Sequence, residues 1–111
     1  MGPGRFDRPG LDAVKRTSYA GYVGYEWLTA ALAALRNVET WEVTQVLSAK
    51  QRLPLAAESA GVHFLTISGR TESGRPLVVA VRLLGGHQQQ IIGAREMTPD
   101  ELARFEAWEA S

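Results

Sequence analysis

The segment that most constrains the fold of this chain is residues 77–84, a nearly continuous apolar run that contains three valines. A valine-rich run of this kind is typical of a β-strand that is buried on both faces and lies at the centre of a sheet. A polar loop with Gly74 precedes the run, and Gly85 and Gly86 follow it. Glycines at these places can adopt the positive φ angles of tight turns. The sequence therefore predicts a central strand with a chain reversal on either side.

The segments beyond those turns have the composition of half-buried strands. Residues 63–68 and 88–94 mix apolar or β-branched side chains with polar ones, as strands with one solvated face do. Together with the central run they predict a three-stranded antiparallel meander. Pro54 precludes a continuing helix before the first of these strands, so residues 53–60 are predicted to be a loop or a short edge strand.

Helical signals lie on both sides of the predicted sheet. Residues 25–36 predict a helix, because apolar side chains recur at helical spacing among several alanines. Residues 40–48 predict a second, shorter helix, whose apolar positions are Trp41, Val43, Val46 and Leu47. The fold class that follows is α+β, with two N-terminal helices, a three-stranded antiparallel meander and a C-terminal helix.

The C-terminal helix has the strongest start signal in the sequence. Thr98 is placed to cap it, Pro99 suits its first position, and Glu101 follows the cap by three residues. This arrangement is a capping box, in which each side chain accepts a hydrogen bond from the other residue's backbone N–H. Leu102, Phe105 and Trp108 are predicted to form the inward stripe of this helix.

Length and composition limit the class of protein. A chain of 111 residues fits one domain, and we predict a flexible arm over residues 1–19, rich in glycine and proline, and a single domain over residues 20–111. The absence of cysteine excludes a disulfide framework and thiolate zinc sites, and two histidines are too few for a histidine-built metal site. No metal or cofactor is expected. No signal peptide or membrane-spanning run is visible, so a cytoplasmic location is expected.

The charged residues are unevenly distributed although the formal net charge is zero. Arginines predominate in residues 62–97, and carboxylates predominate in the C-terminal helix. One interpretation is a basic sheet beside an acidic helix, which suits a charged partner. The other interpretation is that the surface is evenly solvated and that the charged residues cluster along the sequence by chance.

Arg95 is the first candidate for contact with an anion. It ends a strand directly before a helix N-terminus, where a guanidinium and backbone N–H groups can hold a phosphate together. Strict alternation places Arg95 on the same face as Gly93 and opposite Gln90, while Arg82 shares a face with Ala80. The alternative role for Arg95 is an ion pair with Glu101 or Glu72 that joins strand to helix.

Other side chains are weaker candidates. Arg70 and Arg75 flank the predicted hairpin loop and could contact a nucleic-acid backbone, or could simply be solvated. His63 and His87 could transfer protons near neutral pH, although an isolated exposed histidine usually has no such role. The large aromatic side chains are interpreted as core or interface residues rather than stacking platforms; they are Trp27, Trp41, Phe64, Phe105 and Trp108.

The chain resembles the BrnT-type toxins, small proteins of toxin–antitoxin systems with a RelE-like ribonuclease fold. The likeness covers about residues 38–106 and is most specific in the last part. It rests on Gly93, Ala94 and Arg95 at the end of a strand, followed by a threonine-capped helix with a glutamate, an arginine and an aromatic. Those three helix residues are Glu101, Arg104 and Phe105. Upstream, residues 69–79 resemble the family's hairpin that leads into a valine-rich strand.

The resemblance implies a metal-free endoribonuclease that acts on mRNA and is neutralised by a cognate antitoxin, expected to be a small DNA-binding protein. It implies that Arg95 and Arg82 stabilise the reacting phosphate and that Glu101 moves a proton, with His63 as its substitute. The residues expected to bind RNA phosphates are Arg70, Arg75, His63 and Arg104. Gln90 stands where many members have an arginine, and Glu96 where they have a lysine. The alternative is therefore a catalytically degenerate binding module of the same fold, which only engages a protein partner.

Overall fold

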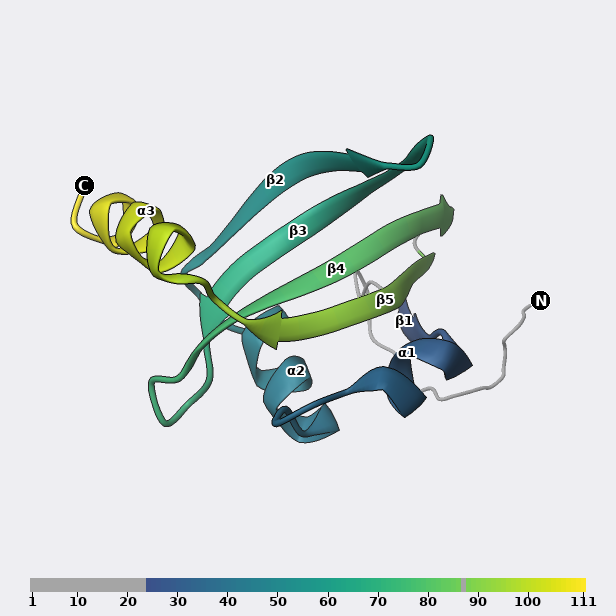
Figure 1. Cartoon of the computed structure of the whole chain (residues 1–111), viewed down its shortest axis with the longest axis horizontal. Coiled ribbons are helices and arrows are strands. Elements are labelled where there is room, and N and C mark those ends of the chain that lie inside the picture. Colours follow the sequence, from purple (N-terminus) through teal and green to yellow (C-terminus); the bar gives the residue numbers. More distant parts are fainter. Residues whose placement is uncertain (1–23, 87) are drawn as a thin grey trace.

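The computed structural model describes residues 24–86 and 88–111. The predicted arm over residues 1–19 and the candidate His87 lie outside the described residues. The elements in chain order are β1 (Gly24–Trp27), α1 (Thr29–Ala34), α2 (Thr40–Leu47), β2 (Arg52–Ser59), β3 (Val62–Arg70), β4 (Pro76–Gly85), β5 (Gln88–Glu96) and α3 (Pro99–Glu109). The strands form one five-stranded sheet in the order β1-β5-β4-β3-β2 (Figure 1). The predicted α+β class is confirmed.

The apolar run is the central strand, as predicted. β4 lies between β3 and β5 and pairs antiparallel with both. Leu77, Val79 and Val81 are fully buried, and Val78 on the opposite face is 5% exposed. Gly74 and Gly85 have φ angles of 94° and 106°, so the turns on both sides of β4 use backbone conformations that glycine adopts without strain.

The sheet is larger than the sequence predicted, because two edge strands extend the meander. Residues 53–60, predicted as a loop or short edge strand, belong to the eight-residue strand β2, which pairs antiparallel with β3. Pro54 is tolerated there because an edge strand has one side without a ladder partner. At the other edge, β1 pairs parallel with β5, which makes the sheet mixed rather than purely antiparallel.

The predicted helix over residues 25–36 is wrong at its start. Tyr25 and Trp27 belong to β1, where they align with Gln89 and Ile91 and pack against the core. Two aromatic side chains at positions i and i+2 satisfy the two-residue period of a strand, and pairing with β5 outweighs the local helical signal. Helix α1 begins only at Thr29 and has six residues.

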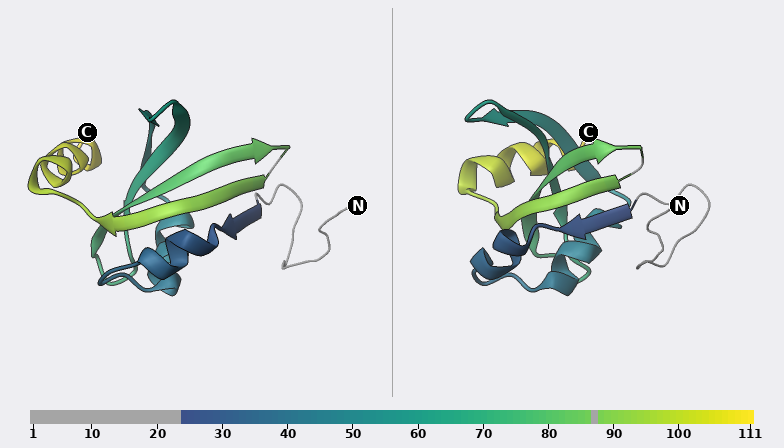
Figure 2. Two further views of the ribbon diagram at one scale, coloured as in Figure 1. Left: turned by 45° about the vertical axis from the view of Figure 1, so that its right-hand side comes forward. Right: turned by 90° about the vertical axis from the view of Figure 1, so that its right-hand side faces the viewer.

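The main core lies between the sheet and helices α1 and α2, which cover one of its faces (Figures 1 and 2). From α2 it receives Val43, Val46 and Leu47, as predicted. Trp41, predicted to share their apolar face, is 58% exposed. It precedes Val43 by two residues, which is about 200° around a helix, so both cannot face the sheet.

Helix α3 begins as predicted. The Thr98 hydroxyl accepts a hydrogen bond from the Glu101 backbone N–H, at 3.2 Å, and the Glu101 carboxylate accepts one from the Thr98 N–H, at 2.8 Å. Phe105 is 1% exposed, while Leu102 and Trp108 are half-buried. In Figure 1, α3 lies at one end of the sheet, and α1 and α2 lie along it.

Candidate functional site

The sheet face that is turned away from α1 and α2 is the candidate functional surface, and we call it the open face. Strand register assigns it the following residues: Leu53 and Leu55 of β2, Phe64, Thr66 and Ser68 of β3, Val78, Ala80 and Arg82 of β4, and Gln90, Gly93 and Arg95 of β5. Among the described elements only α3 approaches this face, and it does so at one end (Figures 1 and 2). Over most of its length the open face is therefore a curved surface that no described helix or strand covers.

A β-bulge in β5 decides which side chains reach the open face. Val81 is aligned with Ile91, but the preceding Ala80 is aligned with Gly93, so Ile92 is an extra residue. The expected alternation placed Gln90 and Arg95 on opposite faces, and the bulge overturns it. Gln90 is aligned with Arg82 and Arg95 with Val78, so both reach the open face.

Arg95 forms the ion pair that was expected as its alternative role. Its two guanidinium nitrogens donate to the two Glu101 carboxylate oxygens at 2.6 and 2.8 Å. This bidentate pair is the main cause that lowers the pKa of Glu101 to about 2, with the Thr98 backbone N–H adding to the effect. The Arg95 side chain is nevertheless 54% exposed, so solvent or an incoming anion can reach its guanidinium.

Arg82 and Arg104 are cations without a carboxylate partner in the described part of the chain. Arg82 donates from Nη2 to the side-chain oxygen of Gln90, and its buried Nε has no hydrogen-bond partner among the described residues. Arg104 is exposed and makes no ion pair with another described residue. A buried guanidinium N–H without an acceptor is unfavourable, so the contact with Gln90 satisfies only part of the Arg82 guanidinium among the described residues.

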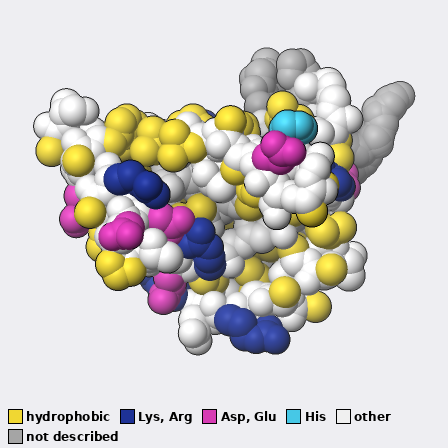
Figure 3. Space-filling model, turned by 45° about the horizontal axis from the view of Figure 1, so that its top comes forward, with side chains coloured by type: hydrophobic (Ala, Val, Ile, Leu, Met, Phe, Trp, Pro, Cys, Tyr) yellow, Lys and Arg dark blue, Asp and Glu magenta, His cyan; other side chains and the backbone are white. Residues whose placement is uncertain are grey.

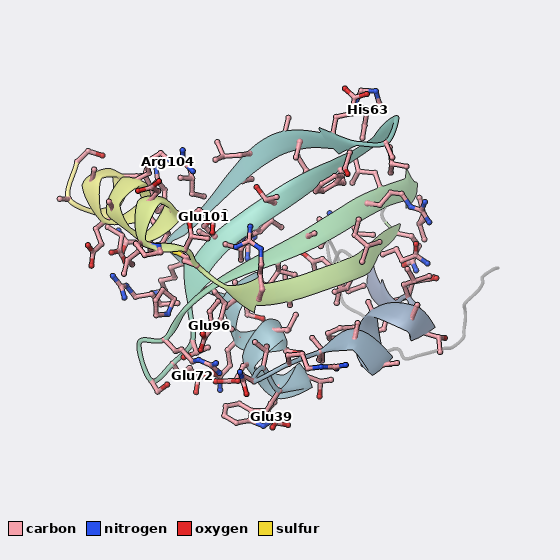
Figure 4. The ribbon with its side chains drawn as sticks, viewed as in Figure 1. Glu39, His63, Glu72, Glu96, Glu101 and Arg104 are labelled. Atoms are coloured by element: carbon pink, nitrogen blue, oxygen red, sulfur yellow. The ribbon has the colours of Figure 1, made fainter. Side chains whose placement is uncertain are left out.

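A shallow pocket of about 70 Å³ lies on the open face beside α3. Its walls combine apolar side chains with hydroxyl and charged groups from three strands and the helix. They are Leu53, Leu55, Thr66, Ser68, Val78, Glu101, Arg104 and Phe105. Figure 4 labels Glu101 and Arg104 on α3 where the helix meets the sheet, and Figure 3 shows basic and acidic side chains intermingled at this end of the molecule.

Arg70 fastens α3 to the sheet. It donates to the two carboxylate oxygens of Glu109 at 2.9 and 3.0 Å and lies 3.5 Å from Glu106. Its guanidinium carbon is 5.6 Å from the centre of the Phe105 ring, within the range of a cation–π contact. The pair lowers the pKa of Glu109. Arg70 thus holds the helix beside the open face, and its charge is compensated within the chain.

Arg75 lies on the helix-covered side of the sheet. Its guanidinium bonds the carboxylates of Glu42, at 2.7 Å, and Glu96, at 2.5 Å, and the backbone carbonyl of Asn37. Glu42 is buried, and its pKa is lowered first by the Glu39 backbone N–H and then by Arg75. This cluster joins α2 to the ends of β4 and β5, away from the pocket.

His63 also lies apart from the pocket. Figure 4 labels it at the far end of the sheet, remote from Glu101 and Arg104, where it is exposed and paired in register with Glu58. Seven of the eight residues that the sequence proposed for a site are described. Five of them lie on the open face or its α3 wall, and Arg75 and His63 do not. The five are Arg70, Arg82, Arg95, Glu101 and Arg104.

Sequence reasoning did not select several residues that shape this surface. Thr66 and Ser68 present hydroxyl groups to the pocket, and Gly93 leaves an opening in β5. Thr66 and Ser68 carry a visible signal, because two hydroxyl residues alternate with apolar ones along β3. The place of Gly93 depends on the bulge at Ile92, which strict alternation does not reveal.

Across residues 24–86 and 88–111, no helix is long and apolar enough to span a bilayer. The same residues contain no group of three or more histidine, aspartate or glutamate side chains placed to hold a metal ion. In comparisons with protein-family models and with curated proteins, no family model and no curated protein matches this chain.

Proposed function

We propose that this chain is a toxin-like endoribonuclease, similar to the BrnT-type toxins, and that the open face binds the RNA. The observation that carries the proposal is that Arg82, Arg95, Arg104 and Glu101 share one face of the sheet, which no described element except α3 covers. These residues come from β4, β5 and α3, so only the folded chain brings them together. A phosphate backbone is the partner that an uncovered set of guanidinium groups fits best.

The ion pair between Arg95 and Glu101 is compatible with phosphate binding. An exposed pair contributes only about 0.2–1 kcal/mol, because water competes for both charges. A phosphate offers Arg95 the same bidentate geometry that the carboxylate does. Replacement of the Glu101 carboxylate by a phosphate on Arg95 therefore costs little free energy, and it releases Glu101.

The release of Glu101 connects binding to chemistry. In RNA cleavage a 2′-hydroxyl loses its proton and attacks the adjacent phosphorus, and the 5′-oxygen leaves. While paired with Arg95, Glu101 has a pKa of about 2 and is a weak base. Once phosphate takes its place on Arg95, the pKa of Glu101 rises toward its ordinary value and the carboxylate can accept the proton. Arg95 then stabilises the negative charge of the pentacoordinate phosphate, and Arg82, four residues further along the same face, holds a neighbouring phosphate.

A second function, a binding module without catalysis, is favoured by a separate observation. Glu101 is the only carboxylate lining the pocket, and the one described histidine lies at the far end of the sheet. If Arg95 keeps its carboxylate, the face retains cations but no efficient base. Under this reading the protein engages its antitoxin, or RNA, without cutting it.

Expression under a tight promoter and incubation of the purified chain with RNA test both functions. Wild-type protein is expected to arrest growth and to cleave single-stranded RNA, and Arg95→Ala is expected to lose most of both effects. Arg36→Ala is the matched control, because Arg36 is exposed after α1 and bonds only nearby backbone carbonyls. RNA that is bound but remains intact supports the binding module. Folded protein that neither binds nor cleaves RNA refutes the proposed function.

Co-expression with the neighbouring reading frame tests the partner. We expect a small DNA-binding antitoxin to restore growth and to protect the open face. Its carboxylates would compete with RNA for the same arginines. A complex whose formation leaves RNA binding unchanged would show that the antitoxin binds elsewhere.

A further inference from the structure

The outer side of β2 is the longest strand edge without a partner among the described residues. β2 has eight residues, whereas β1, the strand at the other edge of the sheet, has four. One side of β2 pairs with β3, and no described strand pairs with the other side (Figure 1). Leu55, in the middle of β2, is 48% exposed. A long edge of this kind presents backbone N–H and C=O groups with which another strand can pair.

One hydrogen bond shows which backbone groups of β2 point to this edge. The Thr66 hydroxyl of β3 donates to the Leu55 carbonyl at 3.4 Å, so the backbone groups of Leu55 point toward β3. Backbone direction alternates along a strand. The residues whose backbone groups point to the free edge are therefore Arg52, Pro54, Ala56 and Glu58. Proline suits such a place, because it has no N–H to leave unpaired.

The charges on β2 are complementary to a second copy of the same strand. Arg52 and Glu58 lie three residues before and after Leu55, and both are exposed. In an antiparallel pair of identical strands centred on Leu55, Arg52 of each copy is directly opposite Glu58 of the other. Opposite charges across a strand pair attract, and two-fold symmetry supplies the pair twice. Edges that resist association carry charges that repel or point inward, so this arrangement favours pairing.

Both side chains can make that contact. Among the described residues neither forms an ion pair. Arg52 bonds the carbonyls of Leu47 and Ala49 through Nη1 alone, which leaves Nε and Nη2 to bond a carboxylate. Arg52 and Glu58 are an even number of residues apart, so their side chains are on the same face of the strand.

Pro54 selects among the possible registers and limits the affinity. In the register centred on Leu55, Pro54 is opposite Ala56, and its carbonyl can accept the Ala56 N–H although the ring offers no donor in return. A register centred on Pro54 would set two prolines opposite each other and lose both bonds. A register centred on Ala56 would separate the opposite charges. Because donors are missing and an edge contact is small, we expect a dissociation constant between about 10 µM and 1 mM.

We propose that β2 is a self-association edge, at which a second copy of this chain pairs antiparallel about a two-fold axis at Leu55. The two sheets then become one, with both open faces on the same side, because opposite residues of a strand pair point to one side. Leu53 and Leu55 line the pocket, and in the dimer they adjoin the partner subunit's Ala57 and Leu55. Each pocket thereby gains a wall from the other copy. This inference is independent of RNA binding, so a monomeric protein would leave the proposed function standing.

Charge reversal tests the ion pairs by sedimentation velocity of the full chain at concentrations from about 10 µM to 1 mM, the range of the expected dissociation constant. Glu58→Arg places like charges opposite each other at both ends of the interface and should weaken the dimer by about tenfold. Combining Glu58→Arg with Arg52→Glu restores attraction and should recover most of the loss. Glu26→Arg is the matched control, because Glu26 is exposed on β1, at the other edge of the sheet.

The Glu26→Arg protein should dimerise like the wild type. A wild-type protein that is monomeric at every concentration would overturn the proposal. So would a Glu58→Arg protein that dimerises as well as the wild type, or a Glu26→Arg protein that loses the dimer.

An introduced thiol tests the register, since the chain has no cysteine. Leu55→Cys places two thiols across the axis in a non-hydrogen-bonded pair, with Cα atoms about 4.5 Å apart, which a disulfide can span. Ala57→Cys is the matched control, because Ala57 is opposite Leu53 and its two copies are about 14 Å apart. Mild oxidation should link the Leu55→Cys protein into a covalent dimer and leave the Ala57→Cys protein unlinked. Equal linkage of both, or no linkage of the Leu55→Cys protein, would refute the register and the axis.

Discussion

At the scale of single residues, the pairing of Arg95 with Glu101 connects the fold to the candidate chemistry. The same carboxylate accepts the backbone N–H of Thr98 and two guanidinium bonds from Arg95. It thus closes the first turn of α3 and ties that helix to the end of β5. One side chain that serves both as a cap and as an ion-pair partner makes the helix start sensitive to pH.

The pH dependence of stability should report this pair. The pKa of Glu101 is lowered on folding from 4.5 to about 2, so its stabilising contribution is fully present above pH 4.5 and is lost as the pH falls through about 2. We expect the contribution to be about 1 kcal/mol, because Arg95 is more than half exposed and water screens the pair. Glu101→Gln should therefore be less stable than the wild type at pH 7 and nearly equal at pH 2.

Urea unfolding followed by circular dichroism at the two pH values measures this difference. Glu58→Gln is the control, since Glu58 is an exposed carboxylate on β2 with no ion pair to another described residue. It should change stability equally little at both pH values. If the Glu101→Gln protein loses as much stability between pH 7 and pH 2 as the wild type does, other carboxylates are responsible for the pH dependence.

At the scale of elements, α3 is held to the sheet by few groups, and each can be tested alone. Phe105 buries its ring, Arg70 bonds Glu109, and the cap orders the first turn. The helix supplies one wall of the pocket through Glu101 and Arg104. Loss of the cap should therefore affect both the stability of α3 and the shape of the site.

Thr98→Ala removes the hydroxyl that accepts the Glu101 backbone N–H and should cost about 1 kcal/mol. For a domain of this size that corresponds to a fall of about 4–8 °C in melting temperature. Hydrogen exchange should accelerate in the first turn of α3, while the amides of β4 stay protected. Thr98→Ser keeps the hydroxyl and should behave like the wild type; an equal loss in both variants would show that the methyl group, not the cap, matters.

At the scale of the whole molecule, three of the described arginines are compensated by carboxylates, and the described cations do not form one continuous basic surface. The formal net charge is zero, and Arg70, Arg75 and Arg95 each bond a carboxylate. Under the proposed function, long-range attraction of RNA would therefore be weak, and binding would depend on local contacts at the open face. This distinguishes the chain from nucleic-acid-binding domains with an extended basic surface.

The salt dependence of RNA binding should reflect this local footprint. If Arg82, Arg95 and Arg104 are the phosphate contacts, the slope of log K against log salt for a single strand should be about −2. Arg104→Ala should reduce its magnitude by about 0.7, whereas Arg36→Ala should leave it unchanged. Anisotropy titrations over a range of KCl concentrations measure the slope. A slope near zero would exclude phosphate contacts as the basis of binding.

The sequence by itself determined the elements whose signals are local. The apolar run predicted the central strand β4, the glycines predicted its turns, and residues 98–101 predicted the start of α3. Each of these depends on interactions within a few residues, so a local pattern carries the information. The sequence also proposed the ion pair between Arg95 and Glu101 that the structure contains, and the functional roles of the arginines remain predictions.

Tertiary structure alone decided which of these residues meet. β1 forms because Tyr25 and Trp27 pair with β5, a strand more than sixty residues away in the chain. Local propensity cannot predict pairing with so distant a segment. The bulge at Ile92 is visible only in the register between β4 and β5, and this single extra residue places Gln90 and Arg95 on the same face as Arg82. Alternation along one strand cannot reveal an irregularity that only the register between two strands creates.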